Sequence, residues 1–409
     1  MRIFLAPLAA AALLFGCAAI AAPAASAAAP DVQWTKTLTE ARGQSVYFNA
    51  WGGSPAINAY LGWVAATVKE RFGITLTHVK LDDTATAVAR VLAEKTAGKT
   101  GGGSVDLVWI NGENFAAMKT QGLLSQGFAT SLPNWRYVDT ANPSVSTDFT
   151  VATDGQESPW GDAKLVFFSD TARTGALASM PKSAAELLAY AKAHPGRITY
   201  PAPPDFTGTS FLKQVLSELA SDRAVLQQPA VEADFAAVTA PLWAYLDALR
   251  PVSWREGRAY PQNYPAMKQL LADGELDVIF AFNPAEASSA IATGELPDTV
   301  RSFTFPAGTL GNTHFVAIPF NSDAKAAAQV VANFLLSPEA QLRKEDPRYW
   351  GDPTVLAMEK LSPEERQAFA AIDRGVATLA PDALGPVLPE PHPSWMERIE
   401  QEWLERYGH

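Results

Sequence analysis

The chain has 409 residues and a formal net charge of -11 at pH 7, with 48% hydrophobic and 18% charged residues. This length suggests two or three domains, and the composition is that of a globular protein rather than a disordered chain or a helical membrane protein. The negative charge argues against nucleic acid as a partner, because a phosphate backbone would be repelled. A cationic or zwitterionic ligand is easier to accommodate.

The segment 1–27 has the pattern of a secretory signal peptide. A basic residue precedes an apolar run that is too short and too rich in alanine for a membrane span, and Ala-Ser-Ala at 25–27 fits the cleavage rule. Cleavage there would remove Cys17, the single cysteine of the sequence. The alternative is a lipoprotein signal with Cys17 acylated, in which Phe15 is an unfavourable residue. Both alternatives predict a periplasmic address.

Strands and helices are expected to alternate along the rest of the chain. Residues 46–64 begin as a strand and become a helix, with Ser54 as N-cap, Pro55 in the first helical position and Gly73 as C-cap. Further strands are predicted at 74–81, 105–110, 158–171, 197–202 and 276–282, with two more within 300–320. Further helices are predicted at 84–98, 114–124, 183–196, 207–220, 242–249, 266–271, 284–294 and 323–344. This order predicts an α/β fold with mainly parallel sheets flanked by helices.

The C-terminal stretch 391–409 is predicted to contain a helix with an aromatic stripe. Trp395, Ile399, Trp403 and Tyr407 follow one another at a spacing of four residues and therefore share one helix face. We interpret this face as docked on the body of the protein. The alternative is a helix that binds a partner.

Motifs of enzymes and metal sites are mostly missing, so no catalytic residue, cofactor or metal is predicted. The turn around Ser54 lacks the final glycine of G-x-S-x-G, and Pro55 has no N–H for an oxyanion hole. The GKT at 98–100 follows a helical stretch and lacks the leading P-loop glycine. The histidines show no zinc-ligand spacing; they are His78, His194, His314, His392 and His409.

Small polar residues beside an aromatic residue recur at predicted strand ends. The six turns are FNAWGGS, VWINGEN, SPWGD, PDFTGTS, AFNPAE and GTLGNTH. The carboxyl ends of parallel strands and the helices that follow them face one crevice, so these turns are expected to line one pocket. The candidate ligand-binding residues are Asn49, Trp51, Gly52, Ser54, Trp109, Asn111, Glu113, Asn114, Trp160, Asp162, Thr207, Gly208, Thr209, Ser210, Phe282, Asn283, Asn312 and His314.

Trp51 is interpreted as a wall of this pocket. Gly52 and Gly53 would let the backbone approach the ligand closely, and Ser54 would both cap the next helix and offer its hydroxyl. The alternative is a core tryptophan packed beneath that helix.

Three stretches, 105–124, 274–287 and 315–344, resemble the extracytoplasmic solute-binding proteins of ABC importers. The phrase LLSPEAQ after an Ala-rich helix is the most specific part. Within these proteins, the chain most resembles the thiamine, polyamine and ferric-ion cluster and its YnjB-type branch. It implies a two-lobed fold of type II whose lobes close over a ligand without chemistry. The expected divisions are 41–157 with about 309–336 for lobe one, 158–308 for lobe two, and 337–409 for a C-terminal helical segment packed on the lobes.

The resemblance implies a small-molecule solute and ABC permease subunits in the inner membrane as partners, with the protein a monomer. Ferric-ion members use a paired Tyr-Tyr that this sequence lacks, so iron is not predicted. Trp51, Trp109, Glu113, Trp160 and Asp162 suit a cation, whereas the helix starts at GGSP and TGTS suit an anionic group. A zwitterion, a thiamine-like compound or an amine satisfies both. The alternatives are an exported hydrolase or transferase on a similar fold, and a structural interaction protein.

Overall fold

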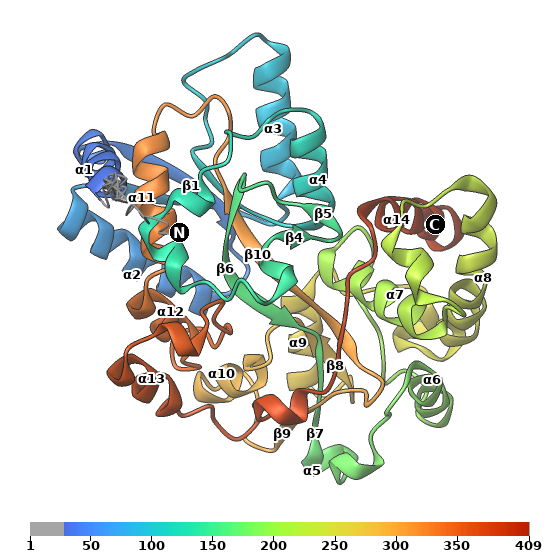
Figure 1. Ribbon diagram of the computed structural model, residues 1–409. Helices are drawn as coiled ribbons and strands as arrows, with labels where there is room; N and C mark the ends of the chain where they lie inside the picture. The colour runs from blue at the N-terminus through green and yellow to red at the C-terminus, as the bar shows by residue number, and fades with distance from the viewer. Residues whose placement is uncertain (1–27, 409) are drawn as a thin grey trace, which may run out of the picture.

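A six-stranded mixed sheet forms the first lobe of the molecule (Figure 1). The computed structural model describes residues 28–408. The strands of this sheet are β1 (Ser45–Trp51), β2 (Thr75–Leu81), β3 (Leu107–Ile110), β6 (Glu157–Lys164), β10 (Thr309–Ala317) and β11 (Val387–Leu388). β1 lies between β2 and β3 and is parallel to both, as the alternating elements predict. β10 is antiparallel to β3 and β6 and parallel to β11.

Helices cover both faces of this sheet. They are α1 (Ala28–Ala41), α2 (Pro55–Phe72), α3 (Ala85–Thr96), α4 (Gly112–Thr120) and α11 (Lys325–Leu335). Successive strand residues point to opposite faces, so Val316 joins the core beside α2 and α11, whereas Phe315 and Ala317 join the core beside α3 and α4. Figure 1 shows these two groups of helices on either side of β1 and β10. The first lobe is therefore a layered α/β unit with two hydrophobic cores.

The second sheet is antiparallel, which corrects the expectation of a mainly parallel sheet in each lobe. Its strands, in the order β8-β7-β9, are β7 (Val166–Asp170), β8 (Ile279–Ala281) and β9 (Val300–Phe303). The segment 197–202, predicted as a strand, contributes a single parallel bridge between Ile198 and Val278. Pro201, Pro203 and Pro204 follow, and prolines have no N–H to continue a ladder.

Six helices surround this second sheet. They are α5 (Thr171–Thr174), α6 (Ala184–Ala193), α7 (Phe206–Leu219), α8 (Glu232–Leu249), α9 (Tyr264–Ala272) and α10 (Glu286–Ala292). Ser183, predicted as the first residue of this helix, is its N-cap and accepts a hydrogen bond from the backbone N–H of Glu186 at 3.0 Å. α7 begins one residue before the predicted start, with Asp205 as its N-cap. One core cluster joins the sheet to α6, α7, α8, α9 and α10.

Two segments in the middle of the chain pass from one lobe to the other. β6 pairs with β10 in the first sheet, and after Leu165 the chain continues as β7 of the second sheet. In β10, Leu310 belongs to the core of the second lobe, whereas Phe315 belongs to the core of the first lobe beside α3 and α4. A small hairpin of β4 (Thr147–Asp148) and β5 (Val151–Ala152) precedes β6. The fold is thus two lobes joined by crossing strands, as the resemblance implies.

The C-terminal part packs on both lobes in turn. α12 (Pro338–Glu345) and α13 (Pro363–Ala370) contribute to the first core, and α14 (Pro393–Tyr407) contributes to the second. Each of the four residues of the aromatic stripe is at most 6% exposed, which confirms that this face is docked on the body. The predicted single Ala-rich helix is wrong, because it ends before Ser337, whose side chain caps α12 by accepting from Ala340 N at 3.2 Å. Pro338 cannot continue a helix from the preceding turn.

The predicted start of α2 is confirmed in detail. Ser54 accepts a hydrogen bond from the backbone N–H of Ile57 at 3.4 Å, Pro55 is the first helical residue, and Gly73 adopts the left-handed conformation after the last turn. The signal peptide predicted at 1–27, with Cys17, lies outside the described residues and stays a prediction. Among the described helices, none has the length and apolar character needed to cross a membrane.

Candidate functional site

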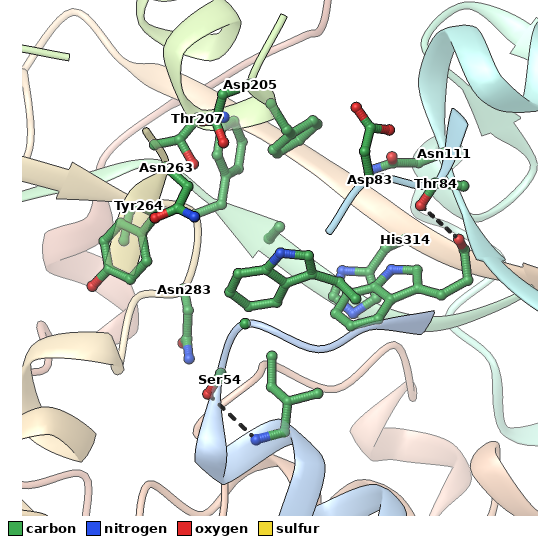
Figure 2. A pocket seen from close by; sticks show the side chains of 18 of the residues that line it. Ser54, Asp83, Thr84, Asn111, Asp205, Thr207, Asn263, Tyr264, Asn283 and His314 are labelled. Carbon is green, nitrogen blue, oxygen red and sulfur yellow. Dashed lines mark hydrogen bonds between the residues drawn. The ribbon is translucent and has the colours of Figure 1, made fainter. Parts of the chain in front are cut away.

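A cavity of about 250 Å³ lies between the two lobes. The first lobe lines it with the turns that follow β1, β2 and β3, and the second lobe lines it with the turn before α7, the start of α9 and the turn after β8. β6 and β10 contribute side chains between them, and α14 adds Met396. Figure 2 shows side chains from both lobes, including Ser54, Asp83, Asn263 and Asn283, around this space.

Eleven of the predicted site residues line this cavity. They are Trp51, Ser54, Trp109, Asn111, Glu113, Asn114, Thr207, Phe282, Asn283, Asn312 and His314. They come from five of the six turns singled out in the sequence. Strand ends from distant parts of the chain therefore meet at one place, as expected for an α/β fold.

Seven predicted site residues do not line the cavity: Asn49, Gly52, Trp160, Asp162, Gly208, Thr209 and Ser210. Asn49 and Trp160 are fully buried in the first lobe. Asp162 accepts a hydrogen bond from the hydroxyl of Thr313 at 2.7 Å, and burial raises the pKa of its carboxyl to about 6 despite that bond. These side chains support the walls of the site rather than face it.

The other predicted residues that do not line the cavity are Gly52, in the turn before α2, and Gly208, Thr209 and Ser210, within α7. Thr209 donates to Glu400 of α14 at 2.6 Å, and Ser210 donates to the carbonyl of Phe206 at 2.7 Å. A Cβ on Gly208 would lie 2.0 Å from the carbonyl oxygen of Pro201, so this glycine permits close packing of the helix. A Cβ on Gly52 would lie 2.6 Å from the Cβ of Lys80. Close packing against neighbouring residues of the protein accounts for both glycines.

Trp51 lines the cavity at the bend between β1 and α2. Its indole folds over Gly53, where an added Cβ would come within 2.3 Å of the ring atom Cζ2 of Trp51. Gly53 is therefore needed to accommodate the ring. The half-buried indole also packs against the hydrophobic core of this lobe that includes Tyr60, whose ring centroid lies 5.7 Å from that of Trp63.

A cluster of aromatic rings forms one wall of the cavity. Trp109 packs edge-on against Trp160, with ring centroids 5.0 Å apart, and lies 5.6 Å from Trp350 and 5.1 Å from His314. Trp109, Trp350 and His314 face the cavity, whereas Trp160 lies behind them. Trp160 thus packs behind the rings that face the cavity and is not itself a lining residue.

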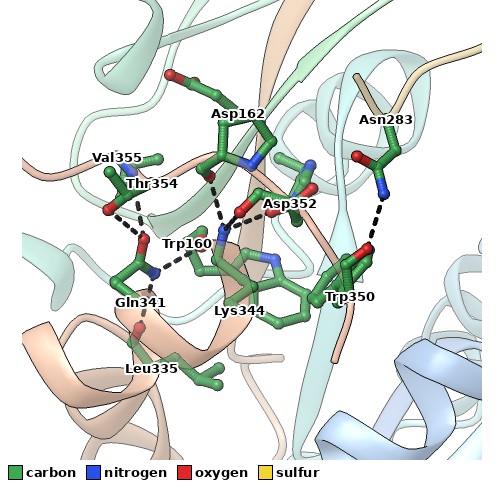
Figure 3. A network of polar contacts seen from close by, with 12 residues as sticks. Trp160, Asp162, Asn283, Leu335, Gln341, Lys344, Trp350, Asp352, Thr354 and Val355 are labelled. Carbon is green, nitrogen blue, oxygen red and sulfur yellow. Dashed lines mark hydrogen bonds and ion pairs between the residues drawn. The ribbon is translucent and has the colours of Figure 1, made fainter. Parts of the chain in front are cut away.

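A buried polar network lies behind this wall of aromatic rings and holds it in place (Figure 3). The ammonium of Lys344, on α12, lies 2.5 Å from Oδ2 of Asp352, and Nε2 of His314 lies 3.1 Å from the same oxygen. An added Cβ on Gly161 would come within 2.0 Å of both Asp352 and His314, so the glycine of SPWGD makes room for this pair. The charge of Asp352 is therefore compensated by the protein itself.

A second set of hydrogen bonds holds the backbone of the same wall (Figure 3). Gln341 of α12 donates to the carbonyl of Trp160 at 2.7 Å, and Asn283 donates to the carbonyl of Trp350 at 3.1 Å. Gln341 belongs to the phrase LLSPEAQ, which the sequence singled out. This phrase supports the site without reaching the cavity.

The charged groups of the described lining are mostly acidic. Six carboxyl side chains, Asp82, Asp83, Glu113, Asp205, Glu286 and Asp352, line the cavity together with one lysine, Lys268. Lys268 is paired with Glu286, at 3.2 Å, and with Glu295. The excess of acidic groups gives the cavity a negative potential that favours positively charged groups.

Glu113 has the most perturbed carboxyl group of this lining for which a pKa is resolved. Burial raises its pKa to about 7, while the charge of Lys213 opposes the increase. Its Oε1 accepts a hydrogen bond from the amide of Asn114 at 2.7 Å. Its Oε2 is buried and has no hydrogen-bond partner among the described residues.

The start of α7 is already occupied by a carboxylate. Asp205 accepts hydrogen bonds from the backbone N–H groups of Thr207 and Gly208, at 2.9 and 3.1 Å. These N–H groups, at the helix start in TGTS, are the ones expected to bind an anionic part of the ligand. The expectation of an anion site at TGTS is therefore wrong, because the N-cap residue satisfies the helix end.

Several lining residues were missed in the sequence, for identifiable reasons. Asp82, Asp83 and Thr84 follow β2, but this strand end contains no aromatic residue or glycine and so did not fit the pattern. Asn263 and Tyr264, at the start of α9, do combine an aromatic and a polar residue and could have been found. Phe206 precedes the TGTS turn, whereas Trp350, Asp352 and Met396 come from the C-terminal part, where tertiary packing alone places them.

Comparison with known proteins identifies the family. Residues 63–356 match the family described as bacterial extracellular solute-binding protein. The chain belongs to this family. It is 52% identical to Protein YnjB of Escherichia coli (strain K12) over 375 residues, which cover 92% of this chain and 94% of that protein. The YnjB-type resemblance is thereby confirmed, and the family implies a periplasmic protein that works as the substrate-binding component of an ABC transporter.

Solved structures share the fold of this solute-binding protein. The lipoprotein Tp0655 (TpPotD) of Treponema pallidum is 13% identical with a TM-score of 0.64, and the periplasmic binding protein AfuA of Actinobacillus pleuropneumoniae is 14% identical with a TM-score of 0.63. Both comparisons cover 89% of this chain and 99% of the other. A putative spermidine/putrescine ABC transporter protein of Listeria monocytogenes is 15% identical, with a TM-score of 0.61, over 89% of this chain and 98% of that one. These likenesses bear out the two-lobed α/β class.

Proposed function

We propose that the protein captures a small organic cation, an amine, a thiamine-like compound or a zwitterion with a cationic group, in the cavity between the lobes. It then delivers this solute to the permease subunits of an ABC importer in the inner membrane. The protein acts as a monomer and performs no chemistry on the solute.

The observation that carries this proposal is the combination of aromatic faces and uncompensated carboxylates in one cavity. Trp51, Trp109 and Phe206 offer ring faces, and a cation over such a face is stabilised by about 0.5 to 2 kcal/mol per contact. Asp83 adds negative charge, and Glu113 adds a carboxyl group that becomes negative on ionisation; neither has a cation of its own in the described lining. An anionic solute would meet these carboxylates and would find the start of α7 already capped by Asp205.

Mass spectrometry of protein purified without denaturation tests the solute class. We expect a cationic or zwitterionic compound to be released on unfolding and to raise the melting temperature of the protein when added back. Thiamine, putrescine, spermidine and γ-aminobutyrate form the initial panel, with glucose and fructose 6-phosphate as neutral and anionic controls. Stabilisation by fructose 6-phosphate alone would overturn the proposed class, and conversion of a bound compound into a product would support an enzyme instead.

A further inference from the structure

We infer that the carboxyl group of Glu113 receives a positively charged nitrogen of the solute, and that it changes from the neutral acid to the carboxylate when the solute binds. This inference rests on the proposed cationic solute and deepens it, because it names the residue that selects for positive charge. It also predicts that binding releases up to one proton to solvent, the amount being the fraction of Glu113 that is protonated in the free protein at that pH.

The position of Glu113 supports this role. It lies in the first turn of α4, directly after β3, and the N–H of Gly112 is held by both oxygens of Asp148 at 2.8 and 2.9 Å. The ring of Phe149 packs against Gly112, where an added Cβ would lie 2.8 Å from the ring. The backbone that carries Glu113 is therefore fixed by β4, so its side chain has a defined position at the cavity wall.

The hydrogen bonds of Glu113 leave one carboxyl oxygen without a partner among the described residues. Oε1 accepts from Asn114 at 2.7 Å, whereas Oε2 is buried and makes no hydrogen bond to another described residue. A buried carboxylate oxygen without a partner is costly, and so is a buried acid proton without an acceptor. An ammonium or amidinium group of a solute would remove this cost by donating to Oε2.

The charged groups around Glu113 come from four elements and explain why it holds a proton in the free protein. Glu400 of α14, Asp83 before α3 and Asp148 of β4 are carboxyl groups that disfavour its ionised form. Lys213 of α7 favours the ionised form.

Lys213 does not keep Glu113 ionised, because the ammonium of Lys213 is already paired with another carboxylate. Its ammonium lies 2.8 Å from Oε2 of Glu390 and over the ring of Phe149, 4.5 Å from the centroid. Burial is the largest influence and raises the pKa of Glu113 to about 7. The free site is therefore partly protonated at neutral pH, and a bound cation shifts it to the carboxylate.

Titration calorimetry measures this proton directly. Thiamine and putrescine keep their positive charges between pH 6 and 8, so any proton released comes from the protein. Phosphate and Tris take up a released proton with different enthalpies. We therefore expect the apparent binding enthalpy at pH 7, for whichever compound binds, to differ between the two buffers by the amount that corresponds to a fraction of a proton released for each solute bound. We also expect binding at pH 8 to be about tenfold tighter than at pH 6, since a group with a pKa near 7 is about 9% ionised at pH 6 and about 91% at pH 8.

The variant Glu113→Gln separates this role from a general effect of charge. We expect it to lose the proton release and the pH dependence, and to bind about 10- to 100-fold more weakly at pH 8. Asp82→Asn is the matched control, because it removes an exposed carboxylate from the same lining and should leave the proton release in place.

The outcomes distinguish this inference from the proposed function. If the wild-type protein binds either cation with the same enthalpy in both buffers and the same affinity at pH 6 and pH 8, the role of Glu113 is wrong while the solute class stands. This measurement needs no variant and so does not depend on the folding of Glu113→Gln. If neither compound binds and an anion does, the proposed function is wrong and the inference falls with it.

Discussion

Two tryptophans at the site differ in whether they face the cavity or the core. Trp51 is partly exposed and lines the cavity, whereas Trp160 is 0% exposed and packs against Trp109 and Trp350. Both come from turns with similar sequence, FNAWGGS and SPWGD. The difference lies in the neighbouring chain. Trp160, on β6, has α12 packed behind it, whereas Trp51 is the last residue of β1 and stands at the carboxyl end of that strand, beside the cavity.

The substitutions Trp51→Ala and Trp160→Ala are therefore expected to have opposite effects. Loss of Trp51 should weaken binding of the cation about 2- to 30-fold, from the loss of one ring contact, with little change in the melting temperature of the free protein. Loss of Trp160 should lower the free energy of unfolding by about 3 to 5 kcal/mol, because it leaves a large cavity in the first core. Calorimetry and denaturant unfolding of both variants check this, and a large loss of stability in Trp51→Ala with unaltered affinity would make Trp51 a core residue.

Glu157 is a buried acid that the binding of a solute does not use. It is 0% exposed, and neither oxygen has a hydrogen-bond partner among the described residues. Burial, with the charge of Asp148 as the second cause, raises its pKa well above the usual range. Above the ordinary pKa of a glutamate, the unfolded chain releases this proton, whereas the folded protein keeps it on Glu157. Folding therefore requires uptake of a proton, and this group makes folding less favourable as pH rises.

The substitution Glu157→Gln should remove this pH dependence. The amide is neutral at every pH, so we expect the variant to gain stability relative to the wild type between pH 5 and pH 8, by about 2 °C or more in melting temperature. Thermal unfolding at both pH values measures the difference. A gap between variant and wild type that stays constant with pH would show that Glu157 is ionised in the folded protein.

At the scale of the elements, the start of α7 shows how a helix end can be mistaken for a ligand site. The sequence TGTS offers backbone N–H groups at a helix start, which bind anions in many proteins. In this fold Asp205 stands immediately before Phe206 and accepts from Thr207 and Gly208. The helix carries its own anion, and its first turn serves to position Phe206 and Thr207 at the cavity.

The role of Asp205 as a cap is tested by two substitutions. Asp205→Ala should lower the free energy of unfolding by about 1 kcal/mol, since it leaves helix N–H groups without an acceptor. Asp205→Asn keeps an oxygen acceptor and should restore most of this loss. Denaturant unfolding of the three proteins gives the comparison, and equal destabilisation by both changes would mean that the charge of Asp205, and not its capping bond, matters for stability.

At the scale of the whole molecule, the two lobes are held together around a buried charge. Lys213 of α7, in the second lobe, is 0% exposed and lies between Glu390 of the C-terminal part and the ring of Phe149 from the first lobe. Glu390 also accepts a hydrogen bond from Asn312, which lines the cavity, at 2.8 Å. Separation of the lobes would return this ammonium to water, which offsets part of the cost of losing these contacts.

Such an arrangement predicts that the solute shifts the protein toward the closed state. A solute that touches both lobes binds the closed form more tightly than the open form, so it changes the populations in favour of the closed form. Small-angle scattering should show a smaller radius of gyration with a saturating cation than without it, and no change with glucose. An unchanged radius at saturation would mean that the lobes do not move on binding.

The sequence by itself determined the features that depend on neighbouring residues. The cap of α2 by Ser54, the left-handed turn at Gly73 and the aromatic stripe of α14 each involve side chains within a few positions of one another. The alternation of strands and helices also predicted the α/β class and brought most of the strand-end turns to one cavity. These patterns are local, so they can be read without knowledge of the partners.

Only the tertiary structure decided which of these side chains face the cavity. Trp109 and Trp160 have similar local sequence, and α12 packing behind the sheet buries one and leaves the other at the cavity. The antiparallel second sheet follows from chain segments that cross between the lobes, which no local pattern reports. Trp350 reaches the site from beyond α12, more than 200 residues after Trp109, because Lys344 and Asn283 hold its loop there. Long-range packing fixes these positions, and its partners are distant in sequence.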